Sequence, residues 1–161
     1  MPISEKEHYT KLFAYENWAN RAHLTSLRTA GDSADDRVAA ARKAFHHTVA
    51  ARHIWHARVT GGALPDHGFY PAFTLDESAA VLERTERLWD EYLCNRTEDD
   101  FGRAKTFRDS FGDQYSMTLR DILFHVLTHS AHHRGQTAIL LRHAGLAPAD
   151  ADFYISPMAR P

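Results

Sequence analysis

Four long segments of the chain repeat their apolar residues with the period of an α-helix, and each lies between residues that start or stop helices. The segments extend from about Lys6 to Thr29, from Ser33 to Gly61, from Thr74 past Tyr92, and from Thr118 to just before Gly145. Ser33, Thr74 and Thr118 each stand three residues before an acidic side chain, which is the spacing of a capping box. Four such helices predict an all-α four-helix bundle.

Two connections are longer than the loops of a simple bundle. Residues 61–73 combine glycine, proline and aromatic side chains, and we expect them to form an ordered crossover. Residues 101–115 alternate apolar and polar side chains around Ser110-Phe111-Gly112-Asp113, which predicts a short hairpin-like insertion between the third and fourth helices. No repeat or polar linker divides the chain, so we expect residues 1–161 to form a single domain.

The composition argues against several classes of protein. The 19 basic and 21 acidic residues give a net charge of −2, which disfavours a nucleic-acid partner. No apolar run approaches the roughly 18 residues of a membrane span, and the first residues lack the apolar core of a signal peptide. The single cysteine, Cys94, cannot form an internal disulfide, and we expect it to be buried late in the third helix. These features favour a cytoplasmic protein with no membrane partner.

Histidine is unusually frequent in this sequence. The chain has 12 histidines in 161 residues, and four of them lie between positions 125 and 133. On a helix, His129 and His133 stand about 40° apart and roughly 6 Å along the axis, so two imidazoles can ligate one metal ion from the same side. His125 and Gln136 lie about one turn to either side of this pair, on a stripe that is otherwise apolar. His132 is rotated by about 60° from His129 and is the weaker candidate.

A pair of ligands on one helix forms only half of a metal site, so a third must come from another helix. His47 lies on a mainly apolar stripe of the second helix and is expected to face the bundle interior, whereas His46 shares its stripe with basic residues and is expected to face solvent. Three imidazoles with a fourth position open to water are typical of a catalytic rather than a structural site. The alternative is a set of core histidines bonded to backbone carbonyls. The histidines expected at the surface or at helix ends are His8, His23, His67 and His143.

Other residues near the histidines are expected to have different roles. Ser130 stands where the metalloprotease motif H-E-x-x-H requires glutamate, so that motif is absent. Arg134 lies about 140° from His129, and we expect it in an ion pair or an interface, with Gly135 allowing close helix packing. Phe13, Trp18, Leu82 and Trp89 could form either core or a dimer face.

The residues from His125 to Gln136 end in H-x-x-x-H-R-G-Q and resemble the signature of the DinB/YfiT-like family. Asn17-Trp18-Ala19-Asn20 resembles the family's opening Y-N-x-W-A-N segment, although Glu16 departs from that pattern. His47, followed eight residues later by a tryptophan, resembles the family's second-helix histidine. The resemblance covers nearly the whole chain, in order.

This resemblance implies a four-helix bundle that holds one divalent metal ion per chain, zinc or nickel, on His47, His129 and His133. Periodicity selects the same three residues. The resemblance also implies frequent homodimers. Some similar proteins are transferases or isomerases that use a low-molecular-weight thiol, and others are known as damage-inducible or stress-associated proteins.

Three functions remain open at this point. The first is a metal-dependent enzyme that activates a thiol or water, of the thiol-dependent transferase or hydrolase type, in which His125 and Gln136 orient ligands or substrate. The second is a non-catalytic metal-binding stress-response protein in which the ion is structural. The third is nickel or zinc buffering by scattered histidines. The sequence identifies neither a general base nor a substrate, and whether the protein is an enzyme stays open.

Overall fold

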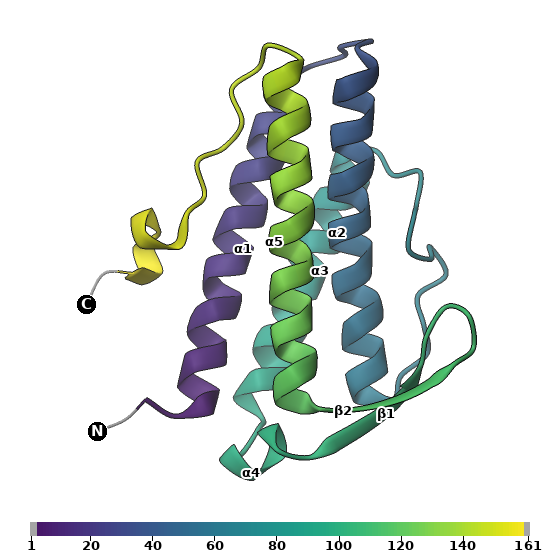
Figure 1. Cartoon of the computed structure of the whole chain (residues 1–161), viewed down its shortest axis with the longest axis vertical. Coiled ribbons are helices and arrows are strands. Elements are labelled where there is room, and N and C mark those ends of the chain that lie inside the picture. The colour runs from purple at the N-terminus through teal and green to yellow at the C-terminus, as the bar shows by residue number, and fades with distance from the viewer. Residues whose placement is uncertain (1–2, 160–161) are drawn as a thin grey trace.

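The computed structural model describes residues 3–159, in which four long helices pack side by side as a bundle (Figure 1). These helices are α1 (Glu5–Thr29), α2 (Asp36–Thr60), α3 (Leu75–Cys94) and α5 (Leu119–His143). Between α3 and α5 lie the short helix α4 (Glu98–Phe101) and an antiparallel hairpin of β1 (Ala104–Arg108) and β2 (Gln114–Thr118). The 3-10 turns η1 (Phe153–Ile155) and η2 (Pro157–Ala159) follow α5. The predicted helical bundle with an inserted hairpin is confirmed.

The connection between α2 and α3 runs the length of the bundle, so these two helices point in the same direction, opposite to α1 and α5 (Figure 1). The expected crossover over residues 61–73 is therefore present. Gly61 ends α2 in the left-handed conformation, with a φ of 70°, which costs least for glycine. None of the helices within residues 3–159 is long and apolar enough to cross a bilayer.

Side-chain caps fix where the helices begin. Thr74 forms the predicted capping box at the start of α3, and the Thr118 hydroxyl accepts a 3.2 Å hydrogen bond from the Asp121 amide at the start of α5. The predicted cap of α2 at Ser33 was wrong. Asp35 caps that helix instead, because its carboxylate accepts hydrogen bonds from both the backbone amide and the guanidinium of Arg37.

Two apolar clusters make up the core, and a buried polar layer separates them along the helices. One cluster includes Phe13 and Trp89, and the other includes Leu27 and Phe45. Phe13 and Trp89 are fully buried, so they belong to the core rather than to a dimer face. The polar layer consists of residues on α1, α2 and α5, namely Glu16, Asn17, Asn20, Arg52 and Arg134.

The polar layer joins α1 to both of the helices that carry the histidines. On α2, Arg52 places its Nε 3.2 Å from Glu16 Oε1 and donates a 2.7 Å hydrogen bond from Nη2 to Asn17 Oδ1. On α5, Arg134 donates a 3.2 Å hydrogen bond from Nη1 to Asn20 Oδ1. Because buried charges are tolerated mainly when they are paired or bonded, these contacts hold α2 and α5 in place against α1.

Two histidines that we expected at the surface are buried. His46 is 6% exposed and lies with Nδ1 2.6 Å from the Ser78 hydroxyl of α3. His23 is 4% exposed, and burial, together with the positive charge of Arg134, lowers its pKa to about 4. In both cases the helix face is covered by another element, which periodicity within one helix does not reveal.

Two expectations about small residues were also wrong. Cys94 is exposed at the last residue of α3 instead of buried. A Cβ atom added to Gly135 would meet no heavy atom within 4 Å, so this glycine does not serve close helix packing. It lines an open space between α5, α1 and the segment after α5.

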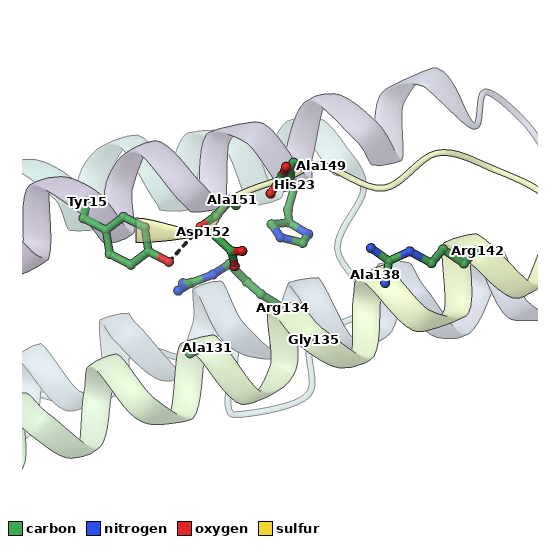
Figure 2. A pocket seen from close by; sticks show the side chains of 11 residues that line it. Tyr15, His23, Ala131, Arg134, Gly135, Ala138, Arg142, Ala149, Ala151 and Asp152 are labelled. Atoms are coloured by element: carbon green, nitrogen blue, oxygen red, sulfur yellow. Dashed lines mark hydrogen bonds between the residues drawn. The ribbon is translucent and has the colours of Figure 1, made fainter. Parts of the chain in front are cut away.

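The segment after α5 returns along α1 (Figure 1). Its attachment includes a 2.8 Å hydrogen bond from the Tyr15 hydroxyl to the Ala151 carbonyl, drawn in Figure 2. The Phe153 ring packs edge-on against the Tyr15 ring, with centroids 5.1 Å apart. The described C-terminal residues are therefore part of the folded structure.

We expect the Arg52→Met variant to lower the free energy of unfolding by about 3–5 kcal/mol, because it leaves the Glu16 carboxylate buried without a counter-charge. Urea denaturation measures this loss. The control is Arg87→Met, which removes an exposed pair with Glu83 one helical turn away and is expected to cost less than about 0.5 kcal/mol. Equal losses in the two variants would contradict a structural role for the buried pair.

The buried His23 makes the stability pH-dependent. Unfolded histidine titrates near pH 6.5, whereas folded His23 has a pKa of about 4, so below pH 6.5 the unfolded state binds a proton that the folded state does not. Stability is therefore lost as the pH falls, by about 2 kcal/mol between pH 7.5 and pH 5 for this residue. Urea denaturation at both pH values, with His23→Gln as the comparison, should show a smaller loss in the variant. The same loss in both proteins would assign the pH dependence to other groups.

Candidate metal centre

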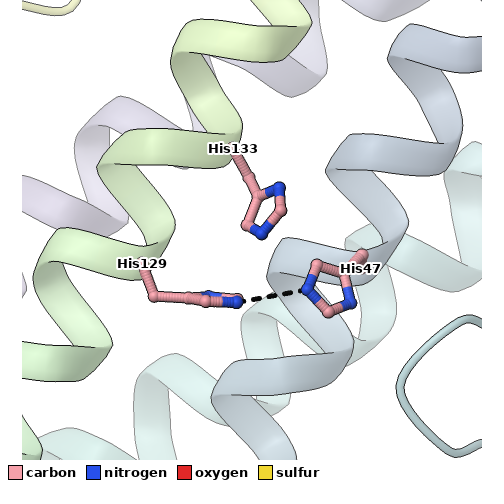
Figure 3. A group of neighbouring side chains, drawn as sticks. All are labelled: His47, His129 and His133. Carbon is pink, nitrogen blue, oxygen red and sulfur yellow. Dashed lines mark hydrogen bonds between the residues drawn. The ribbon is translucent and has the colours of Figure 1, made fainter.

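Three histidines from two helices converge in the groove between α2 and α5 (Figure 3). His47 projects from α2, and His129 and His133 project from successive turns of α5. One ring nitrogen of each histidine lies within 4.8 Å of the others, and the Nε2 atoms of His47 and His129 are 3.2 Å apart. The structure thus brings together the three residues that the sequence predicted as a set.

The loop between α2 and α3 orients the His47 ring. The Phe69 carbonyl oxygen lies 2.8 Å from His47 Nδ1, so that nitrogen carries the proton and donates it, which leaves the lone pair of Nε2 facing α5. The Tyr70 ring stacks on the imidazole, with centroids 4.5 Å apart and an interplanar angle of 9°. Neither residue was predicted to take part, because their closeness to His47 depends on the path of the crossover loop.

A chain of hydrogen bonds on α5 orients His133. The Gln136 amide oxygen lies 2.7 Å from His133 Nδ1, and the Gln136 amide nitrogen lies 3.1 Å from His132 Nε2. With the amide donating to His132, its oxygen accepts from His133, so His133 Nε2 is left with a lone pair. Gln136 therefore contacts one of the three converging histidines, and His132 lies on the exposed outer side.

His125 lies beside the three histidines and is not among the three whose ring nitrogens converge. Its ring packs against Trp55, with centroids 4.7 Å apart, and lies 5.6 Å from the His129 ring. Burial and the charge of Arg58 lower its pKa. His125 thus forms part of the wall next to the candidate site.

The arrangement of ring nitrogens suits a cation. Two lone pairs at 3.2 Å repel unless a proton or a metal ion lies between them, so His47 Nε2 and His129 Nε2 need one or the other. Burial, with the neighbouring histidines, lowers the pKa of His129 to about 3, so its ring is neutral near neutral pH. Neutral imidazole is the form that binds zinc, copper, iron and nickel. The donor set therefore fits a divalent transition-metal ion.

A cavity of about 480 Å³ opens beside the three histidines. His47, His133 and Tyr70 line it. The apolar side chains of Ile139 and Leu140 line it as well, together with alanines of α2. The exposed Lys43 contributes the positive charge in the lining, and no carboxylate of residues 3–159 lines it. A small apolar molecule could therefore reach the histidines from this side.

Comparisons with known proteins agree on one family. A model of the DinB family matches residues 4–159. The crystal structure of a DinB-like protein from Bacillus cereus ATCC 10987, determined at 2.01 Å resolution, is similar with a TM-score of 0.62. The two chains are 22% identical, and the similarity covers 89% of this chain and 95% of that one, which supports the fold alone. A search of curated proteins found no match.

The two orienting hydrogen bonds make a prediction for the metal-free protein. After treatment with a chelator, long-range ¹H–¹⁵N spectra should show the proton of His47 and of His133 on Nδ1, with bare Nε2 atoms. Gln136→Ala should remove this preference at His133 and leave it at His47, whereas Gln136→Glu, which keeps an acceptor oxygen, should preserve both. Protons on Nε2 of both rings in the unmodified protein would contradict the proposed orientation.

Proposed function

The chain belongs to the DinB family, and from this premise we propose that His47, His129 and His133 bind one divalent metal ion per chain, zinc or nickel. We further propose that the protein is an enzyme of the thiol-dependent transferase or hydrolase type. The observation that carries the proposal is the convergence of three imidazoles, one from α2 and two from α5, at distances that a single ion can bridge. When bound, such an ion favours the thiolate form of a thiol or the hydroxide form of water.

The residues around the site have separate tasks in this proposal. The Phe69 carbonyl and Gln136 hold the rings of His47 and His133 so that Nε2 faces the ion. Ile139 and Leu140 give the adjoining cavity an apolar surface that binds the organic part of a substrate and excludes water. The His125 ring packs beside the His129 ring and forms part of the wall next to the site.

The cavity lining favours a thiol over water as the activated group. Among the residues that the structure describes, no carboxylate lines the cavity that could act as a general base toward water. A thiol ionises near pH 8.5 and needs a smaller pKa shift than water does to form the attacking species at neutral pH. Lys43 supplies a positive charge at the cavity, which suits a substrate or thiol that carries an anionic group.

A second function has one observation in its favour. An ion on these histidines would cross-link α2 and α5, as a structural ion does. A non-catalytic metal-binding stress-response protein is therefore the alternative. Under either function we propose that the protein is cytoplasmic and forms a homodimer, and light scattering would test the homodimer.

Metal content per chain tests the proposed site. Tag-free wild-type protein is expected to hold about one ion per chain, and His47→Ala and His129→Ala are expected to lose it, because two imidazoles bind much more weakly than three. His46→Ala is the matched control, since it removes the adjacent histidine of α2, which bonds Ser78 instead. This variant should keep the ion. Equal metal content in all four proteins would exclude the site.

The same proteins distinguish catalysis from a structural ion. The metal-loaded wild type is expected to accelerate the reaction of a low-molecular-weight thiol with an apolar electrophile, and His129→Ala is expected to lose this activity. Chelator-treated protein should keep its helical circular dichroism, since the apolar clusters and the polar layer do not involve the ion. Unfolding on metal removal, without turnover of any electrophile, would favour the structural alternative.

A further inference from the structure

A second cavity, of about 300 Å³, lies between α1 and α5 beneath residues 149–152 (Figure 2). The α5 residues that line it include Ala131, Gly135 and Ala138, whose small side chains leave the space open. Arg134, on the same face, is rotated by about 140° from His129. This cavity is therefore on the other side of α5 from the candidate metal centre.

Arg134 is a buried cation without an internal counter-ion. It is 5% exposed, and its one recorded hydrogen bond goes to the neutral amide oxygen of Asn20. Within residues 3–159 no carboxylate oxygen lies within 4 Å of its guanidinium, so the predicted ion pair is absent. The equally buried Arg52 does have such a partner, Glu16. The Arg134 guanidinium lies over the Tyr15 ring, 5.7 Å from its centroid, which compensates the buried charge only in part. The guanidinium therefore offers strong binding to an anionic group that enters the cavity.

His23 adds a second unsatisfied group to the same cavity. It is 4% exposed, and its buried Nδ1 has no hydrogen-bond partner within residues 3–159. Figure 2 shows its ring between α1 and α5, among the residues that line the cavity with Arg134. Polar atoms that are buried without partners are uncommon, so His23 adds an unsatisfied polar group to the wall of the cavity.

The C-terminal segment that covers the cavity carries negative charge, opposite to that of Arg134. Asp150 and Asp152 line it from the C-terminal segment, opposite Arg134 and Arg142 of α5. Neither aspartate has a basic partner within 4 Å in the part of the chain that the structure describes. The aspartates disfavour a simple anion and the arginines disfavour a simple cation, whereas a molecule with one group of each charge satisfies both.

We propose that this cavity binds a small zwitterionic amino acid. Its carboxylate accepts hydrogen bonds from the guanidinium of Arg134, and its ammonium group lies against the carboxylates of Asp150 and Asp152. The volume of about 300 Å³ is at the small end of ligand pockets and suits a molecule of this size. This inference does not depend on the metal centre.

Isothermal titration calorimetry tests the proposal. The ligands are the proteinogenic L-amino acids, and each is compared with the acid that lacks its amino group. At least one amino acid is expected to bind, about tenfold or more tightly than its deaminated counterpart. Asp152→Asn should weaken binding of the amino acid, because it removes the partner of the ammonium group, and should strengthen binding of the deaminated acid, because it removes a repelling negative charge. His129→Ala should bind the amino acid normally, which separates this site from the metal centre.

A variant that fills the cavity avoids disturbing the buried polar layer. Gly135→Leu places a side chain into the open space, favours the helix and should abolish binding. The control is Ala80→Leu, which adds the same side chain at an exposed position of α3 and should bind normally. The proposal is overturned if no amino acid binds, if the deaminated acids bind as tightly, or if Gly135→Leu binds like the wild type.

Discussion

The buried polar stretch of α1 between Glu16 and Asn20 fixes how the two histidine-bearing helices are rotated. Arg52 follows His47 by five residues on α2, and Arg134 follows His129 by five residues on α5. Five residues turn a helix by about 140°, so each arginine projects from nearly the opposite side to its histidine. Because α1 binds both arginines, the two histidines are turned toward each other across the groove.

The apolar clusters alone would define this rotation less sharply. Leucine, valine and alanine side chains can repack when a helix rotates slightly about its axis. This repacking costs little free energy if the total side-chain volume is kept. A buried charged side chain with few acceptors in reach does not tolerate such a rotation, because the rotation leaves its charge without a partner. The polar layer therefore links the packing of the bundle to the geometry of the candidate metal centre, although none of its residues lies in that centre.

Sequence patterns predicted the features that depend on a single helix. The spacing of His129 and His133 places both rings on one side of α5 whatever surrounds that helix, and the structure agrees. The environment of His46 could not be predicted, because its partner Ser78 lies 32 residues away on α3. The open space next to Gly135 could not be predicted either, because α1 and the C-terminal segment form its other walls. Local periodicity identifies a helix face but not the element that covers it.

The topology of the bundle contributes directly to the candidate site. Since α2 and α3 run in the same direction, the chain between them must travel the full length of the bundle. That path brings the Phe69 carbonyl to His47 Nδ1 and lays the Tyr70 ring on the imidazole. A tight turn to an antiparallel third helix would leave His47 without either contact, and its ring would then be free to choose its tautomer and orientation. The long crossover is thus the part of the fold that gives a histidine on a helix face the fixed orientation that a candidate metal ligand needs.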